Sequence, residues 1–448
     1  MSLLGLGLAS CNWTVFDDLA SETWVERVDG SSKTRFGIAM APLPIDPAGS
    51  AGGANLIVLG RSAVSVSLVK YDAAGKHDTT YFDAEMLRPG VEFKIFPARP
   101  ALAVDPVNRR FAYGGVTGNM EEGQGFVAVL DATTPTTQLG LPRSLGAPGV
   151  GDATARMRPG GISFGDVPST GDLTNGVENM AAFHDVLTAR GTQIDVLFDY
   201  DSARDTLTMP ECTQRNTSTL DTAYGTAFAD LDGDGTAEFV VGMGAVDGLS
   251  SATSEIRIYA IDGLVKPGSV IGTPGPCDAP IDTIPVTGFD GGFALLTTRF
   301  DPAATADDLV YAAPSSNTVF VRLGGTTTQI PLTTPLTGSI FGYALAAGDL
   351  DGDGAPELVV GAPRSDIDGV TDAGAVYIYK FDPVTKTFAP TSTEPLTLSS
   401  PATSAQFGQS LAVVPWGTSG QNVLVVGAEN NAYTYFRTTL YDDVRTGR

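Results

Sequence analysis

The chain has 448 residues, of which 42% are hydrophobic and 17% are charged, so it is too long for a single ordinary core and too apolar to be disordered. Its formal net charge of -24 would repel duplex DNA and anionic membrane surfaces, which excludes nucleic acid as a partner. The 53 Gly and 29 Pro favour many short strands joined by turns over long helices.

The first 20 residues are expected to be a leader and a tail. Residues 8–11 (LASC) resemble a bacterial lipobox, in which cleavage frees the cysteine, here Cys11, to carry a lipid. The apolar stretch before it is short and holds no Lys or Arg, so a plain N-terminal tail is the alternative. No apolar run reaches the roughly 20 residues needed to span a bilayer, so a lipid on Cys11 is the expected route to a membrane.

Residues 21–440 contain a repeat that recurs seven times with an average spacing of about 61 residues. Its apolar runs begin near residues 55, 110, 179, 238, 308, 357 and 422. A second run, β-branched and aromatic with alternating polarity, follows each, as in EIRIYAID from Glu255 and AVYIYKFD from Ala375. In several repeats a third run precedes the apolar run, and it contains Ala and Gly as well as Val and Leu. Three recognisable strands and one variable strand per repeat are typical of a propeller blade.

The repeat therefore predicts an all-β fold, a seven-bladed β-propeller of four-stranded antiparallel blades. Closing such a ring usually borrows a strand from the other terminus. Residues 22–28 (ETWVERV) are placed to supply the outer strand of the last blade, and residues 441–448 form a C-terminal tail.

Two repeats begin with nearly identical acidic loops, DLDGDGTAE from Asp230 and DLDGDGAPE from Asp349. Their spacing brings four carboxylates and one main-chain carbonyl to a single point, and such hard oxygen ligands are those that Ca²⁺ selects. We therefore predict two calcium sites. The first comprises Asp230, Asp232, Asp234, the carbonyl of Thr236 and Glu238; the second comprises Asp349, Asp351, Asp353, the carbonyl of Ala355 and Glu357.

Two other interpretations of these loops are weaker. An EF-hand would need a bidentate Glu at position 12, where Val241 and Val360 stand, and helices on both sides. Acidic surface turns that bind nothing would not require the full ligand spacing twice. Because crowded carboxylates repel each other, we expect both loops to depend on a divalent cation.

The remaining cysteines, Cys212 and Cys277, are a candidate disulfide in an oxidising envelope. Two free buried thiols are the alternative.

The string from Phe341 to Pro363, with its FG pair, acidic loop and ELVVGAP run, resembles the FG-GAP repeat of integrin α-chain propellers and their bacterial relatives. The unit with Tyr224 and Gly225 matches well, and the other five match partly or by spacing. That family generally has Asp at the ninth loop position, where Glu238 and Glu357 stand here; a Glu side chain can still bind an ion through both oxygens.

The resemblance implies that the calcium loops lie on one face of the disc and that a protein or glycan ligand docks on the opposite face. The loops carried over to that face contain seven candidate partner-binding residues: Glu121, Glu122, Asp247, Arg364, Asp366, Asp368 and Asp372. The alternative is a solvated rim of charged side chains, which is the default for exposed charge.

No catalytic residue is assigned, because the two histidines, His77 and His184, belong to no recognisable catalytic arrangement. We expect a calcium-stabilised binding or adhesion module that is extracytoplasmic, in a bacterial cell envelope, and either lipid-anchored or secreted. The alternatives are a polysaccharide lyase or glycoside hydrolase that uses the central depression, and a structural subunit of a cell-surface complex.

Overall fold

The computed structural model describes residues 220–245, 254–260 and 279–416 except 335 and 399, together with strand segments elsewhere between residues 39 and 436. These residues are almost entirely strands and loops, and the one helix among them is the three-residue 3-10 turn Pro314–Ser316. No helix in the described part of the chain is long and apolar enough to cross a bilayer. The predicted all-β class is confirmed.

The first two sheets lie in the N-terminal third of the chain. The first has the order β1-β2-β3-β4, with strands Ala39–Leu43, Asn55–Leu59, Ser65–Tyr71 and His77–Asp83. In the second, β5 and β6 both pair with β7, which is followed by β8 and β9. Its strands are Phe93–Lys94, Ala101–Asp105, Arg110–Thr117, Gly125–Asp131 and Arg143–Ser144.

The third sheet departs from the predicted four-stranded antiparallel pattern. Its path is β10-β11-β12-β14-β18, and β13 also pairs with β12. The strands are Met157–Gly165, Asn179–Val186, Gly191–Asp201, Thr206–Thr208, Cys212–Thr213 and Gly275–Pro276. β14 and β18 are parallel; β18 comes from the connection inside the fourth sheet, and it extends the edge of its neighbour.

The next three sheets are four-stranded and antiparallel, as predicted: β15-β16-β17-β19, β20-β21-β22-β23 and β24-β25-β26-β27. The strands of the fourth sheet are Leu220–Ala229, Glu238–Ala245, Ser254–Tyr259 and Asp282–Val286. Those of the fifth are Leu295–Thr298, Asp308–Ala313, Thr318–Arg322 and Gln329–Thr333. Those of the sixth are Ala344–Gly348, Glu357–Ala362, Ala375–Asp382 and Thr387–Pro390.

The last sheet has three strands in the described residues, β28 (Ser410–Trp416), β29 (Gln421–Ala428) and β30 (Asn431–Phe436). The predicted closing strand at residues 22–28 lies outside the described residues, as do both predicted tails.

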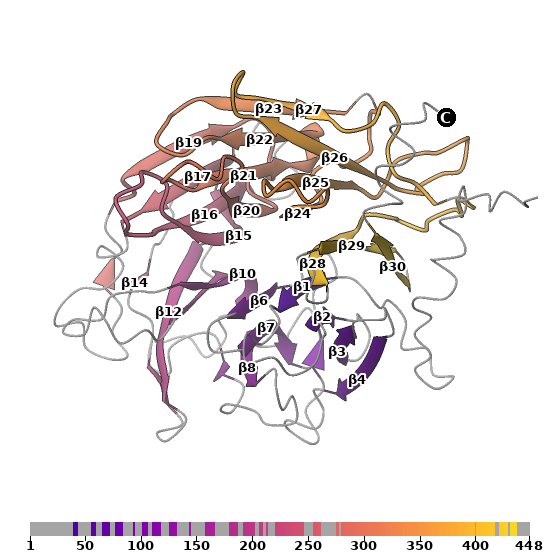
Figure 1. Cartoon of the computed structure of the whole chain (residues 1–448). Coiled ribbons are helices and arrows are strands. Elements are labelled where there is room, and N and C mark those ends of the chain that lie inside the picture. Colours follow the sequence, from indigo (N-terminus) through magenta and orange to yellow (C-terminus); the bar gives the residue numbers. More distant parts are fainter. Residues whose placement is uncertain are drawn as a thin grey trace, which may run out of the picture.

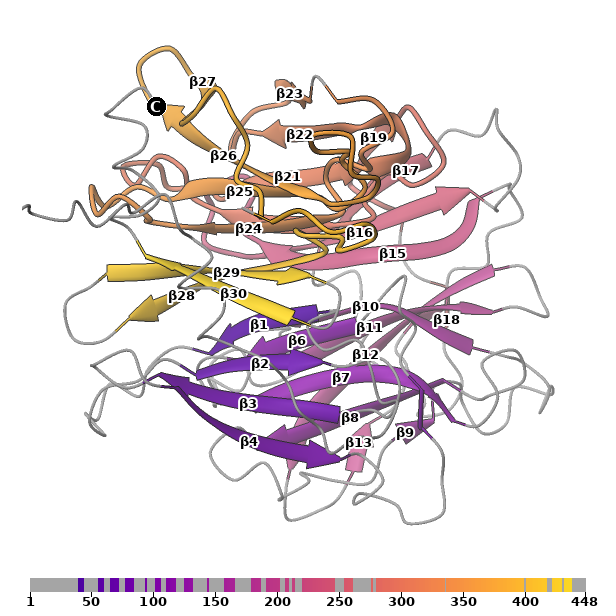
Figure 2. The ribbon, with the colours of Figure 1, turned by 90° about the vertical axis from the view of Figure 1, so that its right-hand side faces the viewer.

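The inner strands of neighbouring sheets pack against one another in chain order: β1, β6, β10, β15, β20, β24 and β28, with β28 packing back against β1. In Figure 1 these strands surround the middle of the molecule, and the later strands of each sheet lie further out. Figure 2 shows most strands running across the molecule, so that loops gather at its two ends. The arrangement is consistent with a propeller.

Glycines let neighbouring sheets approach at backbone distance. A Cβ on Gly361, in β25, would lie 2.1 Å from the carbonyl oxygen of Gly408, which precedes β28. A Cβ on Gly242, in β16, would lie 2.4 Å from the carbonyl oxygen of Gly292, which precedes β20. Both separations are too short for any side chain, so these positions require glycine.

Phe341 fills the space between the fifth and sixth sheets. It is completely buried and packs in one cluster with Val310 and Val360, from the second strands of those two sheets. Its ring meets the ring of Tyr377 edge-on, with centroids 5.4 Å apart. The Phe of the FG pair therefore supplies the contact between sheets, while the glycines allow their backbones to approach.

We predict that Gly361→Ala lowers the thermal midpoint of unfolding by several degrees, because the new methyl group forces the sixth and seventh sheets apart. Overpacking of this kind costs about 1 to 3 kcal/mol. Thermal unfolding followed by circular dichroism measures the effect. Val384→Ala, at a side chain that is 88% exposed, is the control, and equal midpoints for the two variants would contradict the prediction.

Candidate metal centre

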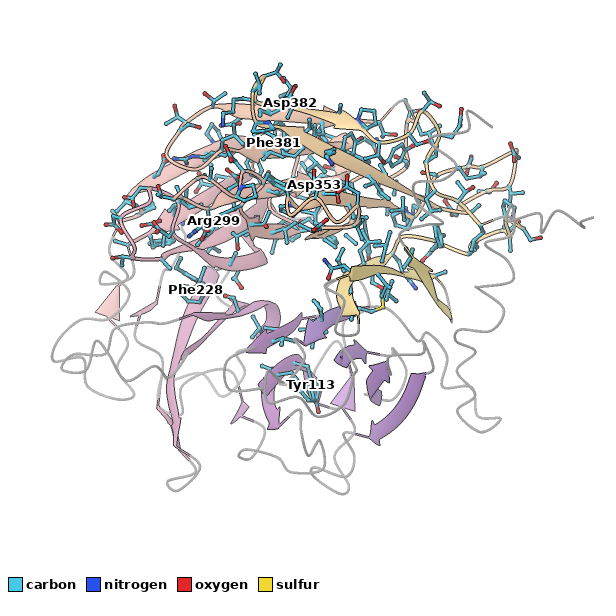
Figure 3. The ribbon with its side chains drawn as sticks, in the orientation of Figure 1. Tyr113, Phe228, Arg299, Asp353, Phe381 and Asp382 are labelled. Carbon is cyan, nitrogen blue, oxygen red and sulfur yellow. The ribbon has the colours of Figure 1, made fainter. Side chains whose placement is uncertain are left out.

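Each acidic loop joins the first strand of a sheet to the second. Residues 230–237 connect β15 to β16, and residues 349–356 connect β24 to β25. Figure 3 labels Asp353 in the second loop and Arg299 in the corresponding connection of the fifth sheet, between β20 and β21. Because the connections are equivalent, the loops can be compared residue by residue.

The first loop is wound by its own carboxylates. Asp230 accepts hydrogen bonds from the backbone N–H groups of Gly233 (2.7 Å) and Gly235 (3.0 Å). Asp232 accepts one from Asp234 (3.1 Å), and Asp234 accepts one from Thr236 (2.7 Å). Gly233 and Gly235 have φ of 83° and 90°, in the left-handed region that favours glycine.

The second loop repeats this conformation. Its hydrogen bonds run from Gly352 and Gly354 to Asp349, from Asp353 to Asp351, and from Ala355 to Asp353. Gly352 and Gly354 have φ of 76° and 90°. The two loops are therefore the same structure built twice.

In both loops three aspartates converge as the spacing predicts. One carboxylate oxygen from each of Asp230, Asp232 and Asp234 lies within 4.8 Å of the others, and the same holds for Asp349, Asp351 and Asp353. At such separations like charges repel by a few kcal/mol in a surface-like dielectric. A cation among them would remove that repulsion.

The glutamate at the ninth position of each loop is buried and hydrogen-bonded to the loop backbone. Glu238 is 7% exposed and Glu357 is fully buried. Oε2 of Glu238 accepts a hydrogen bond from the N–H of Leu231 (2.8 Å), and Oε2 of Glu357 accepts one from Leu350 (2.7 Å). One oxygen of each glutamate is thus held by the backbone, and the other is the one available to an ion.

Oε1 of Glu357 is buried and has no hydrogen-bond partner among the described residues. Burial raises the pKa of Glu357 to about 7, and the neighbouring Asp351 and Asp353 add to the rise. Burial likewise raises the pKa of Glu238, with contributions from Asp232, Asp230 and Asp234. A positive charge beside Oε1 would stabilise the ionised form, since a buried carboxylate without a partner is costly.

In the second loop that positive charge is Lys380, which the sequence analysis missed. Its ammonium contacts Oδ2 of Asp351, lies 2.7 Å from Oδ2 of Asp353, and lies 3.7 Å from Oε1 of Glu357. Its hydrogen bond lowers the pKa of Asp353. The burial of Lys380 disfavours its charged form, but the two aspartates outweigh this and raise its pKa.

Both loops are tied to the following sheet. Asp307, just before β21, donates its N–H to the carbonyl of Asp230 (2.6 Å), and its Oδ2 accepts the N–H of Asp230 (3.0 Å). The side chain of Asn422 donates to the carbonyl of Asp349 (2.8 Å). The loops therefore connect neighbouring sheets, and any ion that orders them would strengthen that connection.

The donor set fits calcium. Carboxylate oxygens from positions 1, 3, 5 and 9 and a main-chain carbonyl at position 7 are hard oxygen ligands of the kind that Ca²⁺ prefers. Oε1 of Glu357, which has no hydrogen-bond partner among the described residues, is an oxygen that such a site would use. Asp230, Asp232, Asp234, Thr236 and Glu238 would hold one ion, and Asp349, Asp351, Asp353, Ala355 and Glu357 the other.

The candidate partner residues near Asp366 lie beyond the other end of β25 from the acidic loop. Arg364, Asp366 and Asp368 are exposed. Oδ1 of Asp366 accepts a hydrogen bond from the N–H of Asp372 (2.9 Å), and the carbonyl of Asp372 accepts one from Gln406 (3.0 Å). This loop is thus held in one shape against the chain that leads into the seventh sheet.

Other predicted residues are described only in part or not at all. Glu121, Glu122, Asp247, Cys11 and Cys277 lie outside the described residues. Cys212 lies in β14, where its backbone pairs with Gly275. The disulfide and the lipid site therefore stay predictions.

Comparison with known proteins agrees with this geometry. Residues 341–379 match the family model of the FG-GAP repeat, a span that runs from Phe341 through the second acidic loop and β25 into β26. The chain is also 32% identical over 94 residues to integrin alpha-PS2 of Drosophila melanogaster, an alignment that covers 19% of this chain and 7% of that protein. The resemblance noted in the sequence is confirmed, and the chain contains an FG-GAP repeat at residues 341–379.

Proposed function

We propose that the chain is a calcium-stabilised seven-bladed β-propeller that acts as an extracytoplasmic binding or adhesion module for a protein or a glycan. The observation that carries this proposal is the placement of two kinds of loop on β25. The ion-binding loop leads into that strand and the exposed loop at residues 363–374 leaves it, so one end can be ordered by calcium while the other meets a ligand.

The ring of inner strands supports the seven-bladed interpretation, because each of the seven packs against the next and β28 packs against β1. Such a ring has no open end, and strand pairing within each blade is protected from edge-to-edge association. Residues 22–28 would complete the last sheet, which has three strands in the described part of the chain.

The binding role is supported by the likeness to an integrin α-chain and by the build of the 363–374 loop. Rigid strands with exposed loops at their ends suit recognition, since such loops can vary without disturbing the sheets. The loop at residues 363–374 is held by backbone hydrogen bonds to Ser339 and to the segment before β28. The backbone that carries Arg364 and Asp368 is therefore held in one conformation, which lowers the entropic cost of binding.

An extracytoplasmic position, in a bacterial envelope and with Cys11 as a lipid site, is part of this proposal. Cys212 and Cys277 would then pair in an oxidising compartment. Cells that express the full chain should incorporate labelled palmitate, and Cys11→Ser should abolish the label. Incorporation that persists in the variant would remove the anchor from the proposal.

The intact mass of the chain, measured without reductant, tests whether Cys212 and Cys277 are bonded.

We expect calcium to raise the thermal midpoint of the full chain above its value in chelator, because an ion that binds only the folded state stabilises it by mass action. At 100 times the dissociation constant the gain is about 2.7 kcal/mol per site. Asp232→Ala should shrink the calcium-dependent increase, whereas Glu394→Ala, at an exposed position, should leave it intact. A midpoint that ignores both chelator and calcium would contradict structural calcium.

We expect the full chain to be retained on some members of a panel of immobilised glycans, polysaccharides and envelope proteins, with Arg364→Ala and Asp368→Asn lowering retention at unchanged thermal midpoint. Glu394→Gln is the control outside this loop. Turnover of a retained polysaccharide would replace the adhesion proposal with the lyase or hydrolase alternative. A fixed stoichiometric partner from envelope extracts would favour a structural subunit.

A further inference from the structure

The two acidic loops have the same backbone conformation but differ in the residue that the third strand of each sheet places beside them. The hydrogen bonds and glycine φ angles of residues 230–238 recur at residues 349–357. The loops differ in sequence only at Thr236 and Ala237 against Ala355 and Pro356, and neither pair adds a charge. A difference in charge around the cation position must therefore come from residues outside the loops.

The register of the third strands identifies that residue. Phe239 pairs with Tyr259 in the fourth sheet, and Leu358 pairs with Tyr379 in the sixth. Phe239 and Leu358 both follow the ninth-position glutamate, so Tyr259 and Tyr379 are equivalent. One residue further along stand Ala260 and Lys380. The fourth sheet thus has a methyl group where the sixth has an ammonium.

The ammonium lies among the oxygens that calcium would use. It contacts Asp351, Asp353 and, at 3.7 Å, the Oε1 of Glu357 that has no hydrogen-bond partner in the described residues. Both oxygens of Asp349 are already engaged by the N–H groups of Gly352 and Gly354. Lys380 therefore neutralises the second loop from within.

We propose that Lys380 is a tethered competitor for the cation position of the 349–357 loop, so that this loop binds calcium more weakly than the 230–238 loop. This inference rests on the calcium sites of the proposed function. A divalent ion with six to eight oxygen ligands and an ammonium cannot both contact the same carboxylates without strong repulsion. Calcium must therefore displace the ammonium, which its flexible four-carbon stem allows, and the lost contacts reduce the apparent affinity.

The test measures calcium affinity of each loop separately in the full chain, by competition with a chromophoric chelator, and stoichiometry by equilibrium dialysis. Asp232→Ala disables the first loop. When Lys380→Met is introduced into this variant, the measured calcium affinity is that of the second loop. The control is Lys386→Met, the same substitution at a lysine that pairs with Asp301 (3.0 Å) rather than with the loop. Conversely, Asp351→Ala disables the second loop, so that added Ala260→Lys reports on the first, with Ala260→Met as the control for size.

We expect Lys380→Met to tighten calcium binding at the second loop at least tenfold, about 1.4 kcal/mol, and Ala260→Lys to weaken it at the first loop by a similar factor. The two methionine controls should leave the affinities unchanged. In chelator, Lys380→Met should lower the thermal midpoint more than Lys386→Met, because the carboxylates lose their internal cation. If Lys380→Met abolishes the β circular dichroism spectrum, the Ala260 pair still decides.

Unchanged affinity in Lys380→Met, or an equal gain in Lys386→Met, would overturn the inference while leaving two calcium sites in place. Equal affinities of the two loops in the unmodified chain would do the same. Failure of the unmodified chain and of every variant to bind calcium would overturn the proposed calcium sites themselves, and the inference with them.

Discussion

The acidic loops depend on a buried carboxylate at the first residue of the second strand. Glu238, Asp308 and Glu357 occupy this place in three successive sheets, and each accepts a hydrogen bond from the loop, from the N–H groups of Leu231, Phe300 and Leu350 respectively. The contact holds the chain reversal between the first and second strands. Burying a carboxylate is costly unless its charge and both its oxygens find partners, so the second oxygen determines what else each loop must contain.

The fifth sheet satisfies that oxygen entirely with protein groups. Oδ1 of Asp308 accepts the N–H of Gly324 (2.8 Å). Two cations pair with aspartates of this loop: Arg299, in register with Asp230 and Asp349, pairs with Asp307 (2.6 Å), and Lys386, from the β26–β27 connection of the sixth sheet, pairs with Asp301 (3.0 Å). The sixth sheet keeps the full set of carboxylates but places Lys380 among them. The fourth keeps the same set with Ala260 above it. Cationic side chains therefore contact the carboxylates of this connection in both the fifth and the sixth sheets.

Much of this could be predicted from the sequence, because the information lies within single repeats. Alternation in EIRIYAID and AVYIYKFD predicts β17 and β26, and the carboxylate spacing predicts how Asp230, Asp232 and Asp234 converge. The contact of Gly361 with Gly408 joins two repeats, so no local pattern encodes it. Two-residue strands such as β14 and β18 are too short to show periodicity. Lys380 is different: aligning the two quoted strands without a gap places it opposite Ala260, and this signal could have been recognised.

If the two loops bind calcium as proposed, their near-identity in sequence does not make them equal in affinity, because the loop supplies only part of the site. The aspartates fix where a cation can lie, the glutamate at the start of the second strand sets how much charge is buried beneath it, and the third strand decides whether an ammonium is already there. A single residue on that strand can therefore change the dependence on calcium without altering the hydrogen bonds that wind the loop. The same acidic loop therefore has two separate roles. Connecting neighbouring sheets requires only the loop conformation. Binding an ion also requires that no other cation occupy the centre of the loop.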